Sequence, residues 1–87
     1  MNTKFGEFTD LKVEPYGDGT YTLSKIETEN EYIFLGFDAP IPSDEVWRFW
    51  VECGDADGHA ETYSADLTES EKEHIKQMYE EYINKAE

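Results

Sequence analysis

The C-terminal segment constrains the fold of this chain more than any other part, because it begins with a helix-capping sequence. In Thr68-Glu69-Ser70-Glu71, the threonine hydroxyl and the second glutamate carboxylate are spaced so that each bonds the other residue's backbone amide. Apolar side chains then recur every three or four residues, at Ile75, Met78, Tyr79, Tyr82, Ile83 and Ala86. This spacing predicts an amphipathic helix over residues 69–85, packed on a sheet through Ile75, Met78, Tyr79 and Tyr82.

The first half of the chain carries strand and hairpin patterns instead. Residues 9–14 and 20–26 alternate apolar and polar side chains, and the intervening Pro15-Tyr16-Gly17-Asp18-Gly19 supplies the positive-φ residues that a hairpin loop needs. Residues 31–37 are apolar on both faces, which is typical of a strand covered from both sides. We therefore predict a hairpin over residues 9–26, followed by a central strand.

Two structures compete for residues 43–53. Ser43 would cap a helix with Asp44 and Glu45 in its first turn, whereas residues 46–51 are mostly β-branched and aromatic, as in a strand. The turn-forming residues 54–58, followed by a matching arm at residues 59–66, favour a strand within a second hairpin. In that register Trp47, Phe49, Val51 and Cys53 face the core, while Arg48, Trp50 and Glu52 face outward or lie under the helix.

The predicted fold class is α+β: a four- or five-stranded antiparallel β-sheet, made of two hairpins plus a central strand, with one C-terminal α-helix packed on one face. Its strand order stays open. The 87 residues are enough for a single domain, 1–87. The lone Cys53 makes no intramolecular disulfide, so packing alone must hold the fold. The first residues lack the apolar run of a secretory signal, and we expect a cytoplasmic protein.

Charge is the second strong feature of the sequence. Lysine and arginine number 7 against 21 aspartate and glutamate, giving a net charge of −14 at neutral pH. Such a chain does not bind nucleic acid by neutralising phosphates, and an anionic membrane repels it. Residues 27–66 hold eleven of the acids and only Arg48 as a base. In an extended chain, Glu27, Glu29 and Glu31 would form a ladder with carboxylates about 6.6 Å apart, on the scale of phosphate spacing.

No catalytic or metal-binding pattern in the sequence is complete. Residues 55–58 resemble the middle of an EF-hand loop, but the first and twelfth positions would be Cys53 and Ser64. Cys53, His59 and His74 are too few soft ligands for structural zinc. A Cys53–His59 pair across a tight hairpin is more often chance proximity than a catalytic dyad. We expect neither enzymatic activity nor a metal or cofactor.

The partner-binding residues that we predict are acids of the central block, with Trp50 as an aromatic anchor beside Arg48. Tryptophan and arginine are enriched where protein contacts are strongest. The predicted set is Glu27, Glu29, Glu31, Asp38, Asp44, Glu45, Trp50, Glu52, Asp55 and Asp57.

In composition and size the chain resembles the small acidic proteins with which phages and mobile elements block nucleic-acid-binding defence enzymes, including anti-CRISPR and anti-restriction inhibitors. The resemblance covers no shared motif. It implies a non-enzymatic inhibitor whose acidic face occupies a basic, nucleic-acid-binding surface of a host protein by nucleic-acid mimicry. The alternative is a small accessory or structural domain whose acidity serves only solubility. The oligomeric state stays open.

Overall fold

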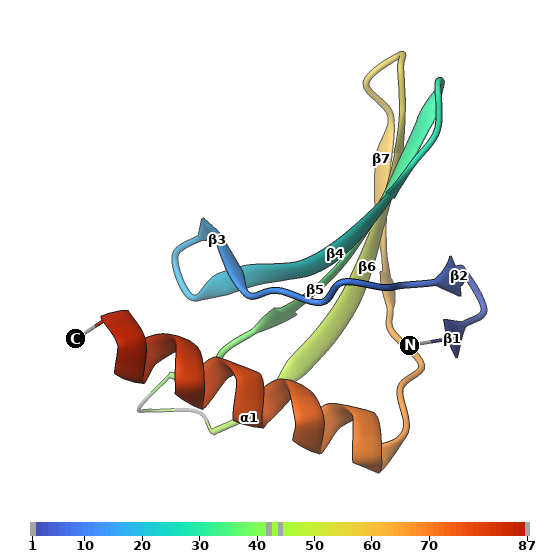
Figure 1. The fold of residues 1–87 in the computed structure, drawn as a ribbon. Helices are drawn as coiled ribbons and strands as arrows, with labels where there is room; N and C mark the ends of the chain where they lie inside the picture. The colour runs from blue at the N-terminus through green and yellow to red at the C-terminus, as the bar shows by residue number, and fades with distance from the viewer. Residues whose placement is uncertain (1, 42, 44, 87) are drawn as a thin grey trace.

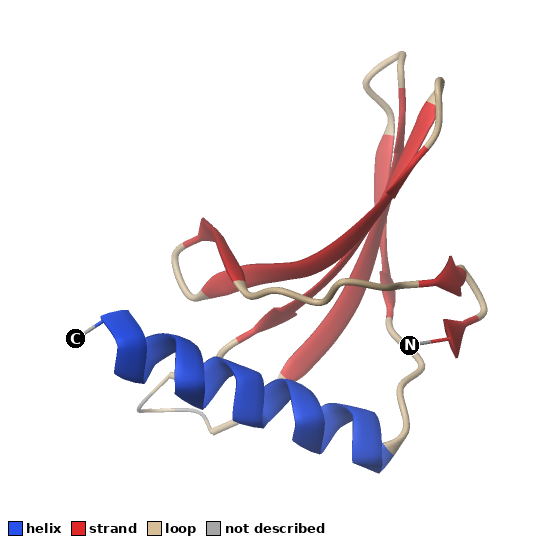
Figure 2. Cartoon of the chain, in the orientation of Figure 1, coloured by secondary structure: helices blue, strands red, loops and turns tan. Residues whose placement is uncertain are grey.

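The computed structural model describes residues 2–41, 43 and 45–86. Figure 1 shows the elements in chain order and Figure 2 shows their type. They are β1 (Asn2–Thr3), β2 (Gly6–Glu7), β3 (Glu14–Gly17), β4 (Thr20–Glu27), β5 (Glu31–Asp38), β6 (Arg48–Asp55), β7 (Ala60–Ser64) and α1 (Glu69–Ala86). Within these residues, no helix combines the length and the apolar character needed to cross a membrane.

Five of the strands form one antiparallel sheet in the order β3-β4-β5-β6-β7, so neighbours in sequence are neighbours in the sheet. β1 and β2 form a separate small hairpin. The predicted α+β fold is therefore confirmed, with β5 as its central strand. Leu35 and Phe37 of β5 are fully buried on one face, while Tyr32 and Phe34 are half-buried on the other.

The helix α1 lies across one face of the sheet, as predicted (Figure 1). Ile75 is fully buried, and Met78, Tyr79 and Tyr82 pack against the core. The Tyr79 ring meets the ring of Phe37 edge-on, with centroids 5.7 Å apart. Ile83, which the sequence pattern placed on the same apolar stripe, is instead 38% exposed. Tyr82, one residue earlier, still packs against the core, so Ile83 lies at the edge of the stripe, where the helix surface turns away from the sheet.

The first predicted hairpin forms with a different first arm. The prediction of a strand over residues 9–14 is wrong: β3 begins only at Glu14, and residues 8–13 cross the helix-bearing face as an extended segment. Asp10 has a φ of 54°, which breaks any regular strand there. The Ser24 hydroxyl donates to the Thr9 carbonyl at 2.7 Å and holds the segment against β4. Val13 and Phe8 of this segment are buried in the core.

Residues 48–55 form strand β6, so the strand prediction for the ambiguous segment is confirmed. Trp47, Phe49, Val51 and Cys53 contribute to the core or pack against it, as the predicted register required. Residues 45–47 are not helical, and the helix start at Ser43 is not formed. Pro42 and Asp44 lie outside the described residues.

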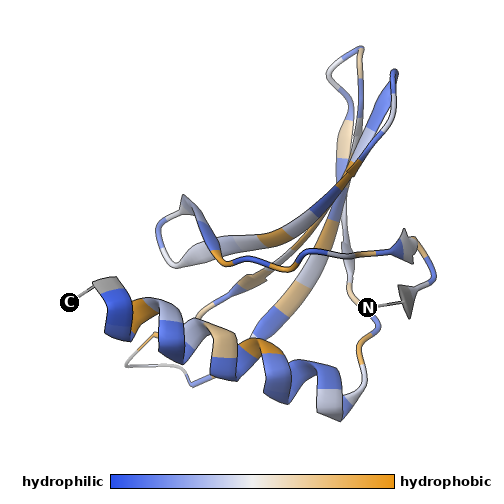
Figure 3. Cartoon of the chain, in the orientation of Figure 1, coloured by the Kyte–Doolittle hydropathy of each residue, from blue (hydrophilic) through white to orange (hydrophobic). Residues whose placement is uncertain are grey.

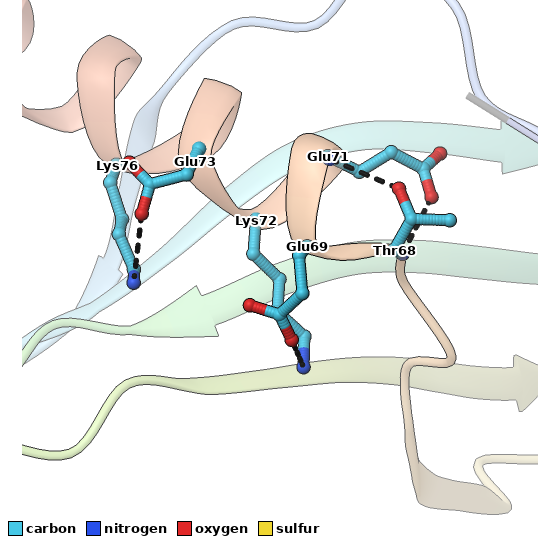
Figure 4. Close-up of polar contacts among 6 residues, drawn as sticks. All are labelled: Thr68, Glu69, Glu71, Lys72, Glu73 and Lys76. Atoms are coloured by element: carbon cyan, nitrogen blue, oxygen red, sulfur yellow. Dashed lines mark hydrogen bonds and ion pairs between the residues drawn. The ribbon is translucent and has the colours of Figure 1, made fainter.

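The cap at the start of α1 is formed as predicted (Figure 4). The Glu71 amide donates to the Thr68 hydroxyl at 3.1 Å, and the Thr68 amide donates to the Glu71 carboxylate at 2.8 Å.

Two lysines of α1 reach aromatic rings of the segment around β6. The Lys72 ammonium lies 5.9 Å from the Phe49 ring centroid, and the Lys76 ammonium lies 5.8 Å from the Trp47 ring centroid. Both also pair with glutamates one turn back, at 3.5 Å.

Replacing Thr68 with alanine is expected to lower the free energy of unfolding by about 1 kcal/mol, because the Glu71 amide loses its cap. Urea denaturation at pH 7 measures the change. Thr68→Ser, which keeps the hydroxyl, is the matched control and should unfold close to the parent. An unchanged midpoint for the alanine variant would show that water replaces the cap without loss.

Candidate binding surface

The tips of the β4–β5 and β6–β7 hairpins lie side by side at the end of the sheet away from α1 (Figure 1). The Ala56 amide donates to the Asn30 carbonyl at 3.0 Å, and Glu31 lies directly opposite Asp55 in the ladder. Such partners have Cα atoms about 4.5 to 5.5 Å apart, well within the Debye length of about 8 Å. We call this end of the sheet the acidic tips, made of Glu27, Glu29, Glu31, Asp55 and Asp57.

The predicted carboxylate ladder within residues 27–31 is not formed. The Thr28 amide donates to the Glu31 carbonyl at 2.8 Å, which closes a tight turn, and Glu27 pairs with Tyr32 across it. Glu27 and Glu31 therefore stand on different strands and different faces. The turn residues Thr28 and Asn30 reverse the chain where the prediction assumed an extended segment. All three glutamates are nevertheless exposed. The Glu27 carboxylate also forms an ion pair with the Lys25 ammonium at 3.1 Å.

Asp55 has a structural part in the β6–β7 turn. Its Oδ1 accepts hydrogen bonds from the backbone amides of Asp57 and His59, both at 3.0 Å, and its Oδ2 lies 3.3 Å from the His59 Nδ1. One ligand atom from each of Asp55, Asp57 and His59 lies within 4.8 Å of the others. These contacts show that the Asp55 side chain holds the turn together. The Asp57 carboxylate is therefore more available to a partner than that of Asp55.

The remaining predicted acids do not join the tips. Asp38 ends β5 and pairs with Arg48 at the start of β6, at the opposite end of the strands. Glu45 is exposed in the connection that leads to β6, and Asp44 lies outside the described residues. The full length of β6 separates the connection before it from the turn after it, so the described acids of these two segments lie at opposite ends of the sheet.

Aromatic side chains cover the face of the sheet that points away from α1. This outer aromatic face comprises Tyr16, Tyr32, Phe34 and Trp50, with Glu52 among them. The Tyr16 ring centroid lies 6.0 Å from that of Phe34 and 5.8 Å from that of Trp50. Trp50 is half-buried, and its indole N–H donates to the Asp38 carboxylate at 2.9 Å.

Two glycines let these rings lie flat on the sheet. Gly36 is the ladder partner of Trp50, and Gly54 is the partner of Tyr32. A Cβ at Gly36 would come within 2.5 Å of the Trp50 ring, and one at Gly54 within 2.1 Å of the Tyr32 ring. Rings packed over cross-strand glycines cover backbone that would otherwise be exposed. The result is a low aromatic platform.

Glu52 is held in the middle of this platform by two tyrosines. The Tyr16 hydroxyl donates to the Glu52 carboxylate at 3.2 Å, and the Tyr32 hydroxyl donates to it at 3.1 Å. Partial burial, reinforced by the Glu52 negative charge, raises the pKa of both tyrosine hydroxyls above its usual value. Both tyrosines therefore remain hydrogen-bond donors across the physiological pH range.

Cys53 and His59 do not form an activated pair. The His59 ring nitrogen interacts with Asp55, and burial raises the pKa of the Cys53 thiol, with Glu61, Glu31 and Glu52 adding to the shift. A nucleophilic cysteine needs the opposite environment, one that stabilises the thiolate. The thiol therefore stays protonated at neutral pH.

Sequence reasoning found Trp50 and Glu52 but missed Tyr16, Tyr32 and Phe34 as surface groups. The two-faced apolar pattern of residues 31–37 contained the signal, since every second ring had to leave the helix-covered core. Tyr16 lies in the predicted hairpin loop, where the sequence carries no such signal. No family model matches the chain, and neither a curated protein nor a solved structure matches it.

Proposed function

We propose that this protein is a non-enzymatic, cytoplasmic binding protein that occupies a basic, nucleic-acid-binding surface of another protein. Its partner would be a nucleic-acid-handling protein of a host cell, blocked in the manner of anti-CRISPR and anti-restriction inhibitors from phages or mobile elements. The observation that carries this proposal is the convergence of the two acidic hairpin tips. Carboxylates from separate turns meet there at one end of the sheet.

Convergence matters because isolated surface charges act weakly. Fourteen excess charges spread evenly over the 5997 Å² surface would lie about 20 Å apart, beyond the Debye length of about 8 Å. Carboxylates gathered on two adjacent turns instead create a local field that attracts a basic surface and speeds encounter. The tip of the β4–β5 hairpin is hydrophilic throughout (Figure 3), so it presents charge rather than an apolar contact.

The experiment measures association with the basic protein that is captured from a bacterial lysate. Glu29→Lys/Glu31→Lys at the tips is expected to slow association about tenfold at low salt. Glu80→Lys/Glu81→Lys on the exposed side of α1 makes the same net charge change and should slow it far less. Raising the salt concentration should remove most of the difference between the two variants.

A competition assay then tests mimicry itself. The parent protein should displace labelled nucleic acid from the captured partner, and the tip variant should displace it less well. Equal slowing by both double variants, or capture of no nucleic-acid-handling protein, would contradict the proposal. The acidity would then serve solubility, as expected of an accessory domain.

A further inference from the structure

We propose that Glu52 and the rings around it form a subsite for the guanidinium group of an arginine on the basic partner. This inference rests on the proposed function for the identity of that partner as a basic protein. It assigns to the outer aromatic face a different task from that of the acidic tips. The tips attract positive charge of any kind, whereas the outer aromatic face selects the planar cation.

The Glu52 carboxylate has hydrogen-bonding capacity to spare. An ionised carboxylate offers about four acceptor positions, and the two tyrosine hydroxyls supply one proton each. Within the described part of the chain, Glu52 takes part in no ion pair. The tyrosines fix the carboxylate in position, and its free lone pairs match the paired N–H donors of a guanidinium group.

The rings favour arginine over lysine. A guanidinium group is planar and weakly hydrated, so it stacks on aromatic faces while it donates sideways to a carboxylate. Tyr16 is 49% exposed and lies against Trp50, which leaves aromatic surface open beside Glu52. A cation already lies on this platform, since the Lys25 ammonium is 5.8 Å from the Phe34 ring centroid. A lysine's compact charge gains less from such a flat surface.

The test titrates the full-length, isotope-labelled protein with two capped peptides, tetra-arginine and tetra-lysine, at low salt. Tetra-arginine is expected to bind about tenfold more tightly and to shift the Trp50 indole N–H resonance, with the resonance of Trp47, which packs against α1, as internal reference. Glu52→Gln should weaken tetra-arginine binding about tenfold and leave tetra-lysine binding nearly unchanged. Glu80→Gln on α1, an identical change at an exposed site, is the control and should affect neither peptide.

Each outcome separates this subsite from the proposed function. Equal affinity for the two peptides, unaffected by Glu52→Gln, would overturn the arginine subsite and leave the acidic tips as the binding element. Arginine selectivity that Glu52→Gln removes, with no basic partner captured, would support the subsite and contradict mimicry. Should Glu52→Gln perturb the fold, Tyr16→Leu removes the open ring instead. It should weaken tetra-arginine binding alone, and unchanged selectivity in that variant would overturn the proposal.

Discussion

Replacing Phe37 with alanine is expected to lower the free energy of unfolding by about 3 to 5 kcal/mol. The Phe37 side chain is fully buried and contacts the rings of Tyr21, Trp47 and Tyr79, so its removal leaves a cavity between β5 and α1. Small domains have about 5 to 15 kcal/mol of stability in total, and this loss is therefore a large fraction of it. Urea denaturation followed by circular dichroism at low temperature measures the change.

Phe34→Ala is the matched control for this experiment. Phe34 belongs to the same strand but is half-buried on the outer aromatic face, where water can fill the space that its ring leaves. Its loss should therefore cost clearly less than that of Phe37. Equal destabilisation by the two variants would contradict the assignment of the core to the helix-bearing face.

Gly36→Ala is expected to destabilise the protein by about 1 to 3 kcal/mol through overpacking. The added methyl group would lie 2.5 Å from the Trp50 ring and 2.6 Å from the Tyr21 carbonyl oxygen, and the backbone oxygen cannot move aside cheaply. The Trp50 ring should therefore lift from the sheet and lose its hydrogen bond to Asp38. Denaturation measures the stability change, and the indole N–H resonance reports the broken bond.

Gly17→Ala provides the comparison, because the nearest atom to its new methyl group would be the Thr20 Cβ at 4.0 Å. That variant should leave both the stability and the Trp50 resonance close to those of the parent. A Gly36→Ala variant as stable as the Gly17→Ala variant would show that the outer aromatic face repacks freely, which would also weaken its part as a preformed platform.

The elements that could be predicted from the sequence are those whose local pattern agrees with their tertiary surroundings. The helix followed from the Thr68 cap and the spacing of its apolar residues, and β6 followed from its β-branched and aromatic residues and the turn that comes after them. Residues 9–13 alternate apolar and polar side chains as a strand does, but they form no strand. Their apolar side chains hold an extended segment that crosses the sheet, and alternation alone does not distinguish such a segment from a strand.

The candidate site was harder to predict, because it depends on how separate turns come together. Eleven acids in the central block indicated a charged surface, but their grouping depended on strand register. The pairing of Glu31 with Asp55 brings two turns together, and the length of β6 keeps Asp38 and Glu45 away from them. The platform around Glu52 depends on the pairings of Gly36 and Gly54 with aromatic residues, which only the assembled sheet reveals.

The acidic tips extend beyond the part of the sheet that α1 covers (Figure 1), and this has a consequence for how the protein can diverge. Exposed turn residues can usually be exchanged with less than about 0.5 kcal/mol of change in stability. Glu29 and Asp57 contribute no side chain to the core, so exchanges at these two positions should leave folding intact as long as Asp55 keeps its hydrogen bonds in the turn. If the proposed partner altered its surface, substitutions at such turn positions would change the contact surface without requiring a new core.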